Sequence, residues 1–178
     1  MTAARRLWLL ALCLGLAACS HYQLGTPAKL TFSTLYIEPA TNKTLLPQSR
    51  AILTTQIRQA FIEDGRLTVV DSPQEADATL SVAITDYHRE IAANRENDTG
   101  LASKFTVTFV TTCTLRDNRS GQAMIDHRLI QVQRGVYTDN GMVRSTTPGD
   151  QLQSEYNTLP LLAQAMASKV SHLVLDVW

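Results

Sequence analysis

Residues 105–115 of this 178-residue chain read FTVTFVTTCTL, and apart from Val110 and Thr111 apolar side chains alternate there with threonines. Successive side chains of a β-strand point to opposite faces of a sheet, so this alternation predicts a strand with one buried face. The expected buried face carries Phe105, Val107, Phe109, Thr111, Cys113 and Leu115. The opposite, polar face carries Thr106, Thr108, Thr112, Thr114 and Arg116.

The flanking segments predict two further long strands. Residues 78–91 also alternate, and the phase of the alternation shifts after Asp86, which indicates a β-bulge or a solvent-facing extension. The polar residues 92–100 predict the tip of a long hairpin. Residues 117–121, DNRSG, predict a tight turn into a strand at 124–136. Hairpin connections of this kind make the three strands antiparallel.

Two amphipathic helices are expected beside these strands. From Pro47 to Asp64 the apolar residues recur at helical spacing, and Gly65 suits a C-terminal cap. A second helix closes the chain, with Thr158 as its N-cap and Pro160 in its first turn, where a proline is tolerated. Its apolar face comprises Leu159, Leu162, Ala163, Met166, Val170, Leu173, Val174 and Val177.

Two short strands, at residues 34–38 and 67–70, complete the elements, and residues 41–44 are expected to form a loop. Two amphipathic helices need one shared apolar surface, which a sheet supplies. The expected fold class is α+β, a two-layer sandwich of a mainly antiparallel four- to five-stranded sheet with two amphipathic helices on one face. No internal repeat or linker divides it, so residues 31–178 are expected to form a single domain.

The first residues have the order of a secretion signal. Arg5 and Arg6 precede an apolar run of about ten residues, which is too short to span a membrane. The segment Leu16-Ala17-Ala18-Cys19 matches the bacterial lipobox. Residues 1–18 are therefore expected to be removed, Cys19 to be lipidated, and residues 19–30 to form a tether. The alternative is an ordinary signal in which Cys19 is incidental.

Lipidation would anchor the protein without a spanning helix, because two or three acyl chains hold firmly where one does not. By resemblance to other lipoproteins, Ser20 after the cysteine favours export to the outer membrane. Removing residues 1–18 leaves 14 basic and 16 acidic residues, a formal net charge of −2. That balance predicts no nucleic-acid partner. Cys113 would be the one free thiol, so no intrachain disulfide is possible.

The sequence contains no recognisable catalytic or metal-binding motif. His21, His88, His127 and His172 are scattered, and no nucleophile elbow or phosphate-binding glycine loop is present. Cys113 could be a nucleophile, but its place on an apolar strand face favours a buried structural thiol. We expect neither an enzyme, nor a cofactor, nor a metal site.

Two polar features remain, and each has two interpretations. The threonine-rich strand face is either the solvated side of a sheet or a surface that lies against a partner. Arg89, Arg95 and Lys104 flank the long hairpin. They are either scattered surface charge or groups that contact phosphates.

Several short motifs, in their order and spacing, resemble the lipopolysaccharide-assembly lipoprotein family LptE. They are IEPATNKT at 37–44, LTVV at 67–70, ADATL at 76–80, ITDY at 84–87 and LRD at 115–117 before Ser120-Gly121. With the lipobox and the closing helix, the resemblance covers nearly the whole chain.

The resemblance implies a role in the outer membrane. Such proteins lie inside or against the lumen of the outer-membrane barrel LptD, assist its folding and help to deliver lipopolysaccharide to the cell surface. The expected partners are therefore an LptD-type barrel and lipopolysaccharide. Arg89, Arg95 and Lys104 are lipopolysaccharide-contact candidates from position and charge alone. The alternative is another envelope binding module, such as a peptidoglycan-synthase activator or a secretion-pore lipoprotein.

Overall fold

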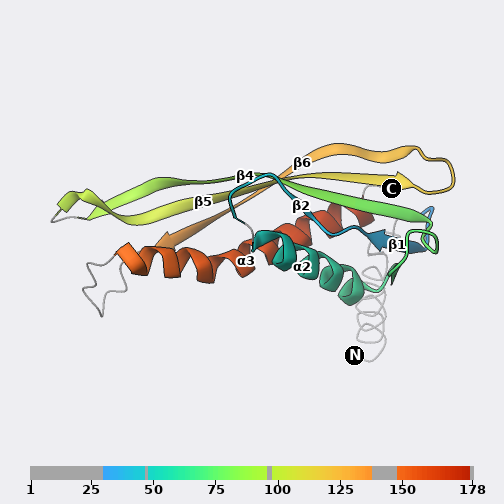
Figure 1. Ribbon diagram of the computed structural model, residues 1–178, viewed down its shortest axis with the longest axis horizontal. Coiled ribbons are helices and arrows are strands. Elements are labelled where there is room, and N and C mark those ends of the chain that lie inside the picture. Colours follow the sequence, from blue (N-terminus) through green and yellow to red (C-terminus); the bar gives the residue numbers. More distant parts are fainter. Residues whose placement is uncertain (1–29, 47, 96–97, 138–147, 177–178) are drawn as a thin grey trace, which may run out of the picture.

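A computed structural model describes residues 30–46, 48–95, 98–137 and 148–176. Its centre is an antiparallel meander of three long strands, β4 (Ala78–Arg95), β5 (Asp98–Asp117) and β6 (Ala123–Tyr137). Two helices, α2 (Ser49–Asp64) and α3 (Pro148–Leu175), lie on one side of this sheet (Figure 1). The predicted two-layer α+β architecture is confirmed.

Three short strands make the sheet mixed rather than antiparallel throughout. They are β1 (Thr34–Ile37), β2 (Thr41–Asn42) and β3 (Thr68–Val70). The order along the sheet is β3-β1-β4-β5-β6, β2 pairs with β4, and all three short strands pair in parallel. The parallel pairing of β1 with β3 follows from the crossover through α2, which returns the chain in the same direction. The prediction of a loop at residues 41–44 was wrong for Thr41 and Asn42, which form β2.

The core lies between the helices and the inward face of the sheet. On β5 the predicted buried face is confirmed from Val107 onward, because Val107, Phe109, Thr111, Cys113 and Leu115 are all buried. Phe105, which was predicted on the same face, is only partly buried. From α2 the buried apolar side chains are Leu53, Ile57 and Phe61. From α3 they include Leu162, Met166, Val170 and Val174. Gly65 caps α2 as predicted, with φ of 72° and its N–H donating to the Phe61 carbonyl at 3.2 Å.

The long helix α3 begins about ten residues before the predicted start at Thr158, so that prediction was wrong. Pro148, not Pro160, occupies the first helical position, and Pro160 lies inside the helix. A proline there deprives the Tyr156 carbonyl of its N–H partner. Packing against the sheet holds the helix together across this point, since Leu159 and Leu162 on either side are both buried.

The hairpin of β4 and β5 is longer than the alternating pattern indicated. Its ladder continues to the pair Arg95 and Asp98, and the expected change of phase appears as a register shift between Ile84 and Asp86. The hairpin tip and the β1 end of the sheet lie at opposite ends of the long axis (Figure 1).

No helix of the described part of the chain is long and apolar enough to cross a membrane. The predicted signal, Cys19 and the tether up to Lys29 lie outside the described residues.

Candidate functional site

The candidate site is the hairpin of β4 and β5 together with the half of α3 beneath it. Residues that face one another across an antiparallel pair share a face of the sheet. Arg89 lies opposite the buried Val107 and therefore faces the helices. Lys104 lies opposite Ala93 and Tyr137, three positions from Val107, and faces away from the helices. The sheet therefore separates these two candidates. Arg95 is the last paired residue of β4, and its side chain lies outside the described part of the structure.

Arg89 connects the hairpin to α3. Its Nη1 donates to Oε1 of Glu155 at 2.7 Å, and its guanidinium carbon lies 6.0 Å from the ring centroid of Phe105. The side chain of Arg89 is 49% exposed, whereas that of Glu155 is only 12% exposed. The ion pair thus neutralises a nearly buried carboxylate while the arginine stays accessible.

Lys104 extends across β6 to an aromatic ring. Its Nζ lies 5.1 Å from the ring centroid of Tyr137. The path crosses Gly135, where a Cβ atom would come within 2.8 Å of Lys104 Cε. Gly135 therefore provides the space for this cation–π contact.

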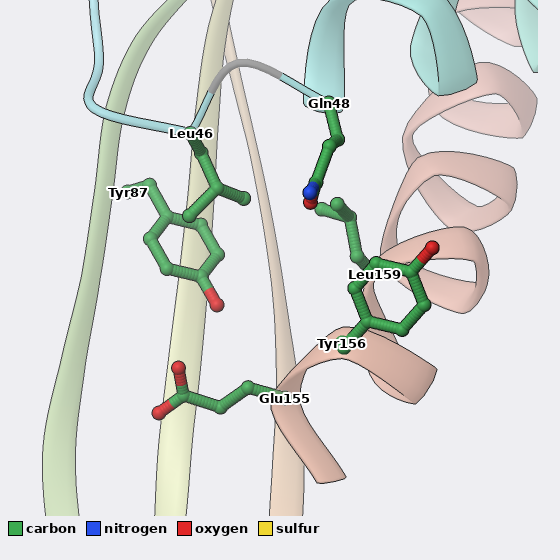
Figure 2. A pocket seen from close by; sticks show the side chains of 6 residues that line it. All are labelled: Leu46, Gln48, Tyr87, Glu155, Tyr156 and Leu159. Carbon is green, nitrogen blue, oxygen red and sulfur yellow. The ribbon is translucent and has the colours of Figure 1, made fainter. Parts of the chain in front are cut away.

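A slot of about 250 Å³ lies between β4 and α3, which we call the β4–α3 slot. The described residues that line it are Leu46, Gln48, Tyr87, Glu155, Tyr156 and Leu159 (Figure 2). The Tyr87 hydroxyl points toward the Glu155 carboxylate, while the Tyr156 ring and Leu159 form the other wall (Figure 2). Burial, and secondarily the charge of Glu155, raises the pKa of Tyr87.

One wall of the slot is the loop that ends at Leu46, and the side chain of Asn42 holds this loop through two hydrogen bonds. Its Nδ2 donates to the Leu46 carbonyl at 2.8 Å, and its Oδ1 accepts from the Thr44 N–H at 2.8 Å. The loop projects Leu45 fully into solvent. A second hollow of about 270 Å³ is also lined by this loop and shares Leu46 and Tyr87 with the slot.

Sequence reasoning missed the slot. Glu155 and Tyr156 were placed before the closing helix because Pro160 was assigned to its first turn. No periodic signal connects these residues with Tyr87 or Leu46, because the lining comes from three separated segments. A sign of the longer helix was Pro148-Gly149, since proline favours a first helical position.

The outward face of the three long strands is not covered by a helix (Figure 1). Thr106, Thr112 and Thr114 are partly exposed there, as the polar strand face predicted. Thr108 is the exception at 1% exposure, and its hydroxyl accepts a hydrogen bond from Nε2 of Gln133 at 3.2 Å. This face carries threonine and glutamine side chains on β5 and β6, and Asp86, His88 and Glu90 on the neighbouring β4.

Cys113 is buried, as its strand position predicted, and burial raises the pKa of its thiol to about 12. A thiol in that state is a poor nucleophile. Within the described segments, no three His, Cys, Asp or Glu side chains gather in a way that could hold a metal ion.

Three solved structures of bacterial lipoproteins have a similar fold. Rare lipoprotein B of Shewanella oneidensis has a TM-score of 0.55 at 11% identity, over 81% of this chain and 95% of that one. A minor lipoprotein of Acinetobacter baumannii has a TM-score of 0.52 at 12% identity, covering 83% and 93%. Lipoprotein B of Nitrosomonas europaea has a TM-score of 0.51 at 16% identity, covering 86% and 87%. At these identities the likeness establishes the fold alone.

No curated protein sequence matches the chain significantly. A family model described as lipopolysaccharide-assembly, LptE, matches residues 32–171. That range includes every strand of the sheet, all of α2 and most of α3. The chain therefore belongs to the LptE family of lipopolysaccharide-assembly lipoproteins.

Proposed function

We propose that this protein is an outer-membrane lipoprotein, anchored through acyl chains on Cys19, that assists assembly of an LptD-type barrel. In that role it is a non-catalytic plug and lipopolysaccharide-binding subunit, held on the periplasmic side or within the barrel lumen, and it helps to deliver lipopolysaccharide to the outer leaflet. The observation that carries the proposal is the family match over residues 32–171.

The shape of the domain suits a place inside a barrel. The 18 residues of β4 extend over about 60 Å at ~3.3 Å per residue. The apolar band of an outer-membrane barrel is about 25 Å tall. A hairpin of this length is therefore long enough to pass through the lumen.

The uncovered sheet face suits the wall of such a barrel. Barrel interiors of this class are polar. The outward face presents Thr106, Thr112 and Gln131, which can exchange hydrogen bonds with a polar wall without the desolvation cost of an unpaired charge. We infer that this face lies against the barrel.

Affinity purification from detergent-solubilised envelopes tests the proposal. The tagged lipoprotein should retain a large barrel of LptD type, identified by mass spectrometry. Thr112→Arg with Gln131→Arg should abolish its recovery, because two long cations prevent close approach of the sheet to the wall. The matched control is Gln59→Arg with Glu63→Arg on the exposed side of α2, which should leave recovery unchanged.

Other partners would contradict the proposal. Recovery of a peptidoglycan synthase, or of a homo-oligomeric ring of this chain, in place of the barrel would favour the alternative class of envelope binding module. Replacing Cys19 by Ala should prevent lipidation and move the protein from the membrane fraction to the soluble fraction.

A further inference from the structure

We propose that the β4–α3 slot receives one acyl chain of lipopolysaccharide, and that Arg89 beside it faces a phosphate of the same molecule. This inference rests on the proposed function and adds to it a second binding element on the helix-facing side of the hairpin. No sequence motif indicated this element.

The chemistry of the slot selects an uncharged, apolar occupant. Leu46, Leu159 and the ring of Tyr156 supply apolar walls (Figure 2). The one carboxylate in the lining, that of Glu155, is already paired with Arg89 at 2.7 Å. A cationic occupant would have to displace Arg89, and an anionic one would be repelled by Glu155. A methylene chain meets neither obstacle and buries apolar surface.

The size of the slot limits what it can hold. Its volume of about 250 Å³ is below the roughly 300–1,000 Å³ of pockets that enclose a drug-sized molecule. A single chain fits such a space, whereas a whole glycolipid does not. The adjoining hollow of about 270 Å³, which shares Leu46 and Tyr87 with the slot, is also lined by Lys43, Thr44, Thr85 and Asp86 and is the more polar of the two.

The surroundings distinguish a lipid from an apolar side chain of a protein partner. Leu45, fully exposed beside Leu46, extends the apolar surface outside the slot. Arg89 is half exposed, and a guanidinium has five N–H donors, so its pairing with Glu155 leaves donors for an anion. A lipid with an anionic headgroup and aliphatic chains would place one chain in the neutral slot and its headgroup beside the accessible Arg89.

Binding measurements on the full-length lipoprotein in detergent test the assignment. The probes are purified lipopolysaccharide and the same preparation chemically stripped of its acyl chains. Leu45→Asp with Tyr156→Asp places one carboxylate in the slot wall, at Tyr156, and one just outside it, at Leu45. Both side chains are exposed, so folding should be retained. The matched control is Ile62→Asp with Leu161→Asp, two exposed apolar residues on α2 and α3 that do not line the slot.

We expect the slot variant to bind intact lipopolysaccharide about tenfold more weakly, with the control unchanged, since the chain loses its apolar contact. Affinity for the deacylated probe should be the same in all three proteins. A Tyr156→Trp reporter in a Trp178→Phe background should also be quenched by lipopolysaccharide with brominated chains.

Three results would overturn the assignment. Equal affinity of the slot variant and the control for intact lipopolysaccharide shows that the slot holds no chain. Loss of barrel recovery with unchanged lipopolysaccharide affinity assigns the slot to a side chain of the barrel instead. If the unmodified protein binds neither lipopolysaccharide nor the barrel, the proposed function itself fails, and the assignment fails with it.

Discussion

The carboxylate of Asp77 accepts a hydrogen bond from the backbone nitrogen of Ser33 at 3.0 Å, across 44 positions of the chain. The same oxygen accepts from the Ser33 hydroxyl at 2.9 Å and from the Thr34 nitrogen at 3.1 Å. The second oxygen is paired with Arg119 Nη2 at 2.6 Å, in the turn between β5 and β6. One side chain thus joins the start of β1, the start of β4 and a distant turn.

Because of Asp77, the stability of the fold should decrease at acidic pH. Hydrogen bonds, first from the Ser33 backbone, hold the pKa of this carboxyl well below its ordinary value. A group with a lowered folded-state pKa contributes stability above its unfolded pKa of about 3.9, and the contribution is lost as pH falls toward the folded value. Asp77→Asn should therefore lower the urea midpoint at pH 7, and the difference from the parent should shrink below about pH 4.

The control for this experiment is Glu75→Gln, at an exposed carboxylate two residues earlier. It should leave the urea midpoint nearly unchanged at both pH values, as followed by circular dichroism. If the urea midpoints of Asp77→Asn and the parent differ by the same amount from pH 7 to pH 3, the negative charge of Asp77 does not account for its contribution to stability.

Pro160 is expected to destabilise the folded protein. A proline inside a helix removes one backbone hydrogen bond and crowds the preceding turn. Pro160→Ala restores an N–H for the Tyr156 carbonyl and should raise the free energy of unfolding by about 1–3 kcal/mol. Chemical denaturation measures this, with Gln164→Ala one turn later as the comparison. A decrease in stability would mean that the buried Leu159 and Leu162 need the local geometry that the proline imposes.

Variants of the pair Arg89 and Glu155 should distinguish the contribution of Arg89 to stability from its contribution to lipopolysaccharide binding. Arg89→Glu places a second carboxylate beside the nearly buried Glu155 and should cost about 1–3 kcal/mol of unfolding free energy. Adding Glu155→Arg reverses the pair and should recover most of that stability. Lipopolysaccharide affinity should stay low in the reversed pair, because the cation has moved from the exposed to the buried partner. Recovery of both properties together would remove Arg89 from the ligand-contact candidates.

Cys113 should be unreactive in the folded protein. Its thiol is buried and burial raises its pKa to about 12, so almost no thiolate is present at pH 8. Iodoacetamide should label the mature lipoprotein only after addition of urea, as measured by intact mass. Cys113→Ser should remain unlabelled under both conditions. Rapid labelling without denaturant would indicate that β5 opens locally.

Local patterns in the sequence decided most of the secondary structure. The alternation at 105–115 fixed both faces of β5, because side chains of a strand alternate whatever the strand pairs with. The helical spacing from Ile52 to Phe61 and the glycine at position 65 likewise determined the buried face and the end of α2. The motifs between Ile37 and Gly121 were enough to indicate the LptE family, to which the chain belongs.

Only the tertiary structure decided which segments meet. The parallel pairing of β2 with β4 depends on backbone partners more than 40 residues away in the chain, which no local pattern indicates. The continuation of α3 through Pro160 depends on burial against a sheet, which outweighs the local preference of proline. The separation of Arg89 from Lys104 followed from strand register, and the slot required Leu46, Tyr87 and Glu155 to converge from distant positions. A sequence determines the periodicity of each element, whereas a cavity exists only between elements that have packed together.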